Sequence, residues 1–195
     1  MSTAWIAADW PAPASVHAGT VLRNGDIAAL QLPGKPCWLQ QVHGANVVAA
    51  GDYEAPPQAD AAVGRHASDV CVVRTADCLP VLFCSADGTR IAAAHAGWRG
   101  LAAGILEATI ARLEQDPGDL MAWLGPAISQ TAYEVGGEVR DAFVEPDPGA
   151  AACFQPNERA RWQADLYALA RRRLAAAGIG ACYGGGLCTF SDSER

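Results

Sequence analysis

Two histidines and one cysteine stand in three short segments whose residue types suit a metal site. The segments are Gln-Val-His-Gly around His43, Thr-Ala-Asp-Cys-Leu-Pro around Cys78, and His-Ala-Gly-Trp-Arg-Gly beginning at His95. Two imidazoles and a thiolate can hold zinc and leave a fourth position open for water or substrate. Each ligand falls at the end of an apolar stretch, where one sheet can bring all three together. The pattern therefore favours a catalytic metal site over a structural one.

Charged neighbours extend this site. Asp77 precedes Cys78 and is a candidate for a polar or acid–base role. Arg99 stands where a helix is predicted to begin, and free N–H groups with a partial positive charge suit an anion there. A guanidinium adds a bidentate clamp for phosphate or carboxylate. The alternatives are a surface arginine paired with a carboxylate and, for His43, a surface histidine in a hairpin turn.

The remaining cysteines are better explained by packing. Cys71 and Cys84 lie inside apolar runs and are expected to behave as small core hydrophobes. No local signal marks Cys37, Cys153 or Cys182. Seven cysteines is an odd number, and we expect free thiols or metal ligands in a reducing cytosol, not a disulfide framework.

The apolar pattern predicts elements that can position these ligands. Strands are expected at 38–42, 46–50, 70–73, 81–84, 91–94, 121–124 and 181–183, after a loop-rich segment at 1–36. Helical spacing predicts helices at 101–113, 137–144 and 164–177. Because strands and helices are interleaved without strict alternation, we predict a mixed α/β fold, a mixed β-sheet sandwich flanked by helices, in one domain spanning 1–195.

Composition limits the partners. The chain has 195 residues, of which 51% are hydrophobic and 18% charged, as in a globular protein. Its net charge of −7 disfavours nucleic acid and anionic membrane surfaces as partners. No apolar stretch approaches the roughly 18 residues of a membrane span, and residues 1–6 do not resemble a signal peptide. We expect a cytoplasmic monomer or homodimer that acts on a small molecule.

With Leu-Gly-Pro-Ala-Ile at 124–128 and Leu-Cys-Thr-Phe at 187–190, the three motifs resemble the YfiH-type laccase-domain family across residues 37–192. The resemblance implies a YfiH-like fold and a zinc ion bound by His43, Cys78 and His95. It implies phosphorolysis of adenosine, inosine, guanosine or methylthioadenosine, and adenosine deamination as a second activity. Purine nucleoside and phosphate would then be the substrates. Gln41, Arg99 and Cys188 are the expected substrate-binding residues.

The chain departs from this family in two places. Relatives carry a longer segment, with a Ser/Gly/aromatic/Asn-Leu motif and a helix, between the first strand and the His-Gly motif. Here residues 20–25 run almost directly into residues 26–31. Relatives also continue past the position of Arg195 into a further strand. We therefore expect a single domain that either is naturally short, without an N-terminal insertion and a C-terminal strand, or is represented by a sequence from which these segments are missing.

Three other functions fit the same residues. Without a metal, Cys78 is a candidate nucleophile of a hydrolase or transferase, with His43 or His95 as its base. A copper-dependent polyphenol oxidase is disfavoured by the small number of histidines, four, and methionines, two. A His₂Cys site can nevertheless take up copper in vitro. The last alternative is a non-catalytic cell-wall quality-control protein with a vestigial site.

Overall fold

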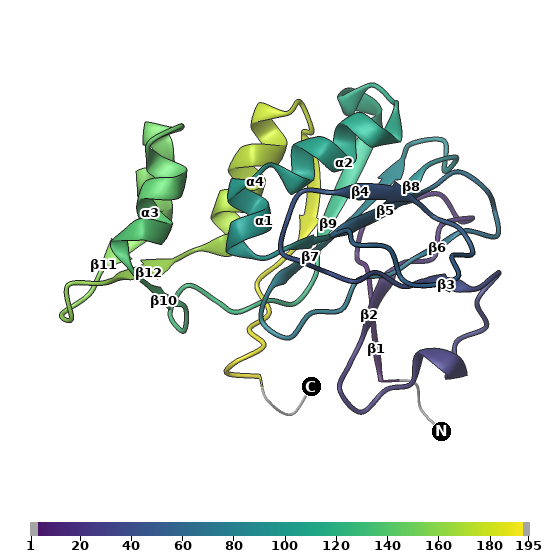
Figure 1. Ribbon diagram of the computed structural model, residues 1–195, viewed down its shortest axis with the longest axis horizontal. Helices are drawn as coiled ribbons and strands as arrows, with labels where there is room; N and C mark the ends of the chain where they lie inside the picture. Colours follow the sequence, from purple (N-terminus) through teal and green to yellow (C-terminus); the bar gives the residue numbers. More distant parts are fainter. Residues whose placement is uncertain (1–3, 193–195) are drawn as a thin grey trace.

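A six-stranded mixed sheet forms the centre of the computed structural model, which describes residues 4–192 (Figure 1). The strand order is β13-β9-β7-β8-β5-β4. Strand β7 pairs antiparallel with β8 and β9, whereas β4 pairs parallel with β5 and β13 with β9. The strands are β4 (Val47–Ala49), β5 (Ala61–Gly64), β7 (Leu79–Ser85), β8 (Ile91–Ala96), β9 (Leu120–Leu124) and β13 (Ala181–Gly184). This architecture confirms the predicted mixed α/β class.

Helices cover one face of this sheet: α1 (Trp98–Ala102), α2 (Ile105–Leu113) and α4 (Leu166–Ala176) (Figure 1). Alternate residues of β7, including Val81 and Phe83, are buried in the cluster that also holds the apolar residues of α2 and α4. Strand β8 contributes only alanines to that cluster, at 92, 94 and 96. Small side chains there let α2 approach the sheet closely. Burying each large apolar side chain contributes about 1.5–3 kcal/mol.

The N-terminal part of the chain lies over the opposite face of the sheet (Figure 1). It contains the antiparallel pair β1 (Trp5–Ala7) and β2 (Gly19–Val21), followed by the 3-10 helix η1 (Ile27–Ala29). Strands β3 (Pro36–Cys37) and β6 (Val70–Cys71) pair in parallel beside it. The segment at 1–36, predicted as loop-rich, therefore contributes two short strands and the first residue of β3, and so few residues leave no periodic signal.

A second layer of structure extends to one side of the sheet, at the left of Figure 1. Strands β10 (Glu134–Val135), β12 (Trp162–Ala164) and β11 (Phe154–Pro156) form an antiparallel sheet in that order. Helix α3 (Gly137–Val144) and the 3-10 helix η3 (Pro148–Cys153) lie beside it, and η2 (Pro117–Asp119) precedes β9. The bounds of α3 match the prediction, but these three strands were not predicted.

Three predicted elements differ in the structure. Residues 38–42 form no strand beyond an isolated bridge at Gln40, because the Gln41 side chain, not the backbone, pairs with the backbone of Arg74. The helix predicted at 101–113 begins earlier, at Trp98, and is divided into α1 and α2. Its interruption is at Gly104, whose φ of +93° is incompatible with a continuous right-handed helix. The strand predicted at 70–73 is only the two residues of β6.

None of the helices described at 4–192 combines the length and apolar character that a membrane crossing requires. The predictions concerning a signal peptide and a C-terminal strand fall partly on residues 1–3 and 193–195, which lie outside the described residues.

The start of α4 provides a test of the fold. The Asp165 carboxylate accepts a hydrogen bond from the Ala168 backbone N–H at 2.9 Å and caps the helix. Replacing Asp165 with alanine should lower the free energy of unfolding by about 1 kcal/mol, because an N–H group of the first turn loses its partner. Urea unfolding measures this change. The exposed Glu158→Ala variant should shift stability by less than about 0.5 kcal/mol, and equal effects of both variants would contradict the capping role.

Candidate metal centre

His43, Cys78 and His95 meet at one edge of the central sheet. His43 lies in the loop before β4, Cys78 immediately precedes β7, and His95 is the penultimate residue of β8. Their ligand atoms all lie within 4.8 Å of one another. The two imidazole rings meet edge to face, with centroids 4.7 Å apart. The structure therefore brings together the three residues that the sequence singled out.

A fourth residue, Asp60, organises this site, and the sequence analysis did not identify it. It is fully buried directly before β5, and its Oδ1 lies 2.9 Å from His95 Nδ1. The same carboxylate accepts hydrogen bonds from the backbone N–H groups of Val42, His43 and Gly44. One buried side chain thus orients the His95 ring and holds the loop that carries His43. Because Asp60 engages Nδ1, the Nε2 atom of His95 is left for a metal.

The His43 loop depends on this support. His43 has a φ of +59°, in the left-handed region that non-glycine residues rarely adopt. Hydrogen bonds from the N–H groups of His43 and its two neighbours to Asp60 hold the backbone in this conformation. The strained residue is a ligand of the candidate site, which is where such strain commonly occurs.

Two glycines in the His-Ala-Gly-Trp-Arg-Gly motif leave room for the site. A Cβ on Gly97 would lie 2.7 Å from Cys78 Sγ and 3.3 Å from the His43 ring. A Cβ on Gly100 would lie 2.9 Å from the Gly44 carbonyl oxygen. Any larger residue at either position would displace a ligand or its loop. The glycines of the motif are explained by close packing, not by unusual backbone angles.

Polar contacts connect the surrounding loops to the Cys78 segment. The Gln41 amide donates to the Arg74 carbonyl and accepts from the Arg74 N–H, both at 2.8 Å. Both ends of this amide are thus used in positioning, and its predicted role in substrate binding stays a prediction. On the other side, Thr189 Oγ1 donates to Asp77 Oδ1 at 2.7 Å. The segment that contains Cys188 is therefore fastened beside Asp77.

The two other predicted substrate contacts lie in different environments. Cys188 is buried, and its Sγ accepts from the backbone N–H groups of Ser129 and Ser191. Although burial raises the pKa of this thiol, hydrogen bonds from those two serines lower it to about 6. Arg99 is exposed, and its guanidinium stacks on Trp98 at 4.4 Å. It has no ion-pair partner among residues 4–192.

Helix α1, which Arg99 was predicted to open, has only five residues. The charge at a helix end arises from aligned peptide dipoles, so α1 contributes less to anion binding than predicted. Tyr133, absent from the sequence-based set, also belongs to this region. Burial and the neighbouring Cys78 raise its pKa to about 12, and Arg99 opposes that rise. Its tyrosyl group therefore stays protonated and able to donate a hydrogen bond at neutral pH.

The electrostatics around Cys78 disfavour a free, activated thiolate. Burial, together with the negative charges of Asp77 and Asp60, raises the pKa of the Cys78 thiol. Burial lowers the pKa of His95 although Asp60 opposes this effect, so the imidazole is neutral and able to coordinate at neutral pH. Burial alone would raise the pKa of Asp60, but its hydrogen bonds to His95 and to three N–H groups lower it. The donor set fits a divalent cation with N and S preference.

Comparison with known proteins agrees with this geometry. Residues 16–195 match the family model described as multi-copper polyphenol oxidoreductase laccase. The chain belongs to the YfiH-type laccase-domain family. A Pseudomonas aeruginosa family member named purine nucleoside phosphorylase is 46% identical over an alignment of 220 positions, which covers 98% of this chain and 90% of the relative. Escherichia coli YfiH, also named purine nucleoside phosphorylase, is 51% identical, with coverages of 86% and 69%.

A family member of known crystal structure, from Neisseria meningitidis, has the same fold. It superimposes with a TM-score of 0.93 at 42% identity, and the match covers 98% of this chain and 90% of that protein. The alignment with the Pseudomonas relative has 220 positions, more than the 195 residues of this chain, so it contains gaps in this chain. The relative therefore has internal residues that this chain lacks.

The orienting role of Asp60 can be measured by metal affinity. Changing Asp60 to asparagine removes the charge beside His95 and weakens the support of the His43 loop. Zn²⁺ affinity should fall about 10–100-fold, the usual effect of removing a carboxylate that orients a ligating histidine. Competition with a chromophoric chelator gives the affinity. The exposed Asp52→Asn variant, which loses only its contact with Lys35, is the control. A folded Asp60→Asn protein with unchanged affinity would contradict this role.

The raised pKa of Cys78 predicts slow alkylation in chelator-treated protein. Only the thiolate reacts, so the rate of iodoacetamide labelling at Cys78 should be low at pH 7. It should rise about tenfold per pH unit up to pH 9 without reaching a plateau. Peptide mass spectrometry follows the labelled site, and Cys78→Ala identifies its peptide. A plateau near pH 7 would instead indicate an activated, metal-free nucleophile.

Proposed function

We propose that this protein is a purine nucleoside phosphorylase whose site binds Zn²⁺ through His43, Cys78 and His95. The observation that carries the proposal is the convergence of these ligands around Asp60, in a family whose similar members are named purine nucleoside phosphorylases. Three protein ligands leave one position for a small molecule, as in catalytic zinc sites. Adenosine, inosine, guanosine and methylthioadenosine are the proposed substrates.

In phosphorolysis, a phosphate oxygen forms a bond to C1′ of the ribose while the bond from C1′ to the purine breaks. The electron pair of that bond leaves with the purine, which takes up a proton, and ribose 1-phosphate is released. Catalysis therefore requires phosphate held near C1′ and a proton donor or hydrogen bond at the departing base. A bound zinc ion supplies Lewis acidity to a coordinated oxygen.

The residues around the metal ligands can meet these requirements. Arg99 is exposed and without a carboxylate partner among residues 4–192, so its guanidinium is available to bind phosphate. Asp77 is placed beside Cys78 and fixed by Thr189, which suits it to a polar or acid–base role. The protonated hydroxyl of Tyr133 is a further candidate donor. Cys188 is proposed to line the same region from the adjoining segment.

The alternatives are weaker on the same geometry. A metal-free cysteine hydrolase needs a lowered thiol pKa, whereas the surroundings of Cys78 raise it. A blue-copper site commonly has an axial methionine. Met121, the one methionine within residues 4–192, pairs with Cys84 in the sheet, away from the ends of β7 and β8 that hold the ligands. Adenosine deamination remains a proposed second activity at the same site.

Metal analysis combined with phosphate-dependent release of free base tests the proposal. We expect about one zinc per chain, and release of adenine from adenosine only when phosphate is present. Both should be lost in Cys78→Ala because that variant removes a ligand. The Cys182→Ala variant, which removes a thiol from β13, is the matched control. Arg99→Met should retain zinc and raise the KM for phosphate at least tenfold.

The other outcomes separate the alternatives. Zinc binding without turnover of any of the four nucleosides would indicate a non-catalytic role. Activity retained without metal, and lost on alkylation of Cys78, would indicate the cysteine nucleophile. Inosine formed from adenosine without phosphate would establish deamination.

A further inference from the structure

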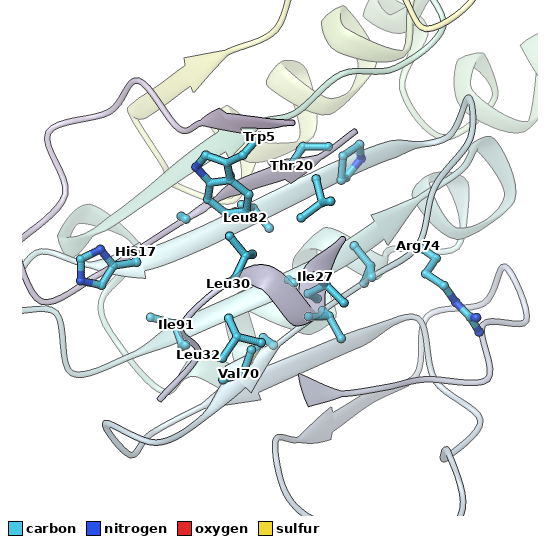
Figure 2. A pocket seen from close by; sticks show the side chains of 18 of the residues that line it. Trp5, His17, Thr20, Ile27, Leu30, Leu32, Val70, Arg74, Leu82 and Ile91 are labelled. Carbon is cyan, nitrogen blue, oxygen red and sulfur yellow. The ribbon is translucent and has the colours of Figure 1, made fainter. Parts of the chain in front are cut away.

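A large apolar cavity lies between the central sheet and the N-terminal layer, on the face opposite α2 and α4. Its volume is about 590 Å³, within the range of small-molecule sites. The floor is formed by Leu82 of β7 and by Ile91 and Ala93 of β8. The roof is formed by residues 16–32, including η1 (Figure 2).

Specific contacts hold the roof at its edges. At one side, Trp123 Nε1 of β9 donates to Asp9 Oδ1 at 2.6 Å. At another, Gly88 in the turn between β7 and β8 lies so close to residues 13–15 that a Cβ there would approach Ser15 Oγ to 2.8 Å. The paired strands β3 and β6 close a third side. The cavity is therefore bordered on three sides by fixed elements and open to solvent elsewhere.

The walls of this cavity are apolar yet incompletely buried. Leu82 and Ile91 remain partly accessible, although their neighbours toward the helices, such as Val81 and Phe83, are 0% and 1% exposed. The roof residues Leu30 and Leu32, among others, are also only partly buried. Apolar surface left accessible inside a concave site is typical of ligand-binding pockets. An apolar ligand would remove this surface from water.

The charged residues of the lining indicate that one end of the cavity accepts an anionic group of a ligand. Figure 2 shows His17 and Arg74 at opposite ends of the lining. The Arg74 guanidinium lies 5.5 Å from the centre of the Trp38 ring and has no ion-pair partner among residues 4–192. The single carboxylate in the lining, Asp26, caps η1 by accepting from Ala28. Arg74 is thus free to bind an anionic ligand group.

We propose that this cavity binds a free medium-chain aliphatic carboxylate. The branched aliphatic side chains that dominate floor and roof suit a flexible hydrocarbon chain better than a flat polar ring. A carboxylate at the Arg74 end matches the planar guanidinium in charge and hydrogen-bonding geometry. None of the candidate metal ligands His43, Cys78 and His95 lines this cavity, and the proposal does not depend on the proposed nucleoside chemistry.

Isothermal titration of the full chain with dodecanoate, below its micellar concentration, tests the site. We expect one dodecanoate per chain, with micromolar affinity, and weaker binding of the uncharged dodecanol. Leu30→Trp fills the cavity from the roof and should weaken dodecanoate at least tenfold. Arg74→Met should weaken dodecanoate about fivefold and leave dodecanol unchanged. Arg23→Met, which removes an exposed arginine outside the lining, should change neither.

Other results would overturn the proposal. Absent or unsaturable binding, or binding unaffected by Leu30→Trp, would show that the cavity is not the site. Equal affinities for dodecanoate and dodecanol, with no effect of Arg74→Met, would refute the binding of the ligand carboxylate by Arg74. Binding only to phosphatidylglycerol vesicles would assign the apolar surface to membrane lipid instead. Circular dichroism checks folding, and Leu32→Trp replaces Leu30→Trp if that variant does not fold.

Discussion

The buried carboxylate of Asp60 is the interaction on which the candidate metal centre depends. It accepts hydrogen bonds from three backbone N–H groups that have no partner in a helix or strand. It also fixes the tautomer and the direction of the His95 ring. A buried charge is tolerated only with such complete hydrogen bonding. Removing it would leave those donors unsatisfied and the left-handed His43 unsupported. Ligand geometry and local stability are therefore provided by the same side chain.

The backbone of Asp60 also connects three strands of the sheet. Its N–H donates to the Asn46 carbonyl before β4, and its carbonyl accepts from the His95 N–H of β8 at 2.7 Å. The residue that orients the ligands thus lies in the ladder that positions β5 between β4 and β8. Distortion of this part of the sheet would move the His43 loop and His95 together. The site is accordingly a property of the sheet edge and not of one flexible loop.

The sequence was sufficient to predict the clustering of His43, Cys78 and His95 and the mixed α/β class, because both leave local signals. Residue type and neighbouring glycines identified His43, Cys78 and His95, and apolar runs identified β7, β8 and β9. Asp60 was not found because it follows a polar, proline-bearing loop and nothing local indicates that it is buried. Strand β5, Ala-Ala-Val-Gly, was missed because alanine and glycine have low strand propensity.

Tertiary contacts account for the other differences. The side-chain amide of Gln41, and not its backbone, forms the hydrogen bonds to the backbone of Arg74. The stretch at 38–42 therefore forms no strand, although its apolar residues predict one. The strands β10, β11 and β12 contain two or three residues each, fewer than a periodic pattern needs. The break at Gly104 falls within an apolar repeat that continues across it, so the pattern predicts one helix where the backbone forms two.

The register of β7 against β8 finally determines whether the centre can form. Leu79 pairs with Ala96 and Pro80 with His95, which places Cys78 just beyond the ladder beside Gly97. The alanines of β8 must face α2, so His95 necessarily points to the opposite face. A slip of one residue would exchange these faces, burying the imidazole under the helices and exposing alanine at the site. The apolar packing of the helix side thus fixes the position of the ligand on the other side.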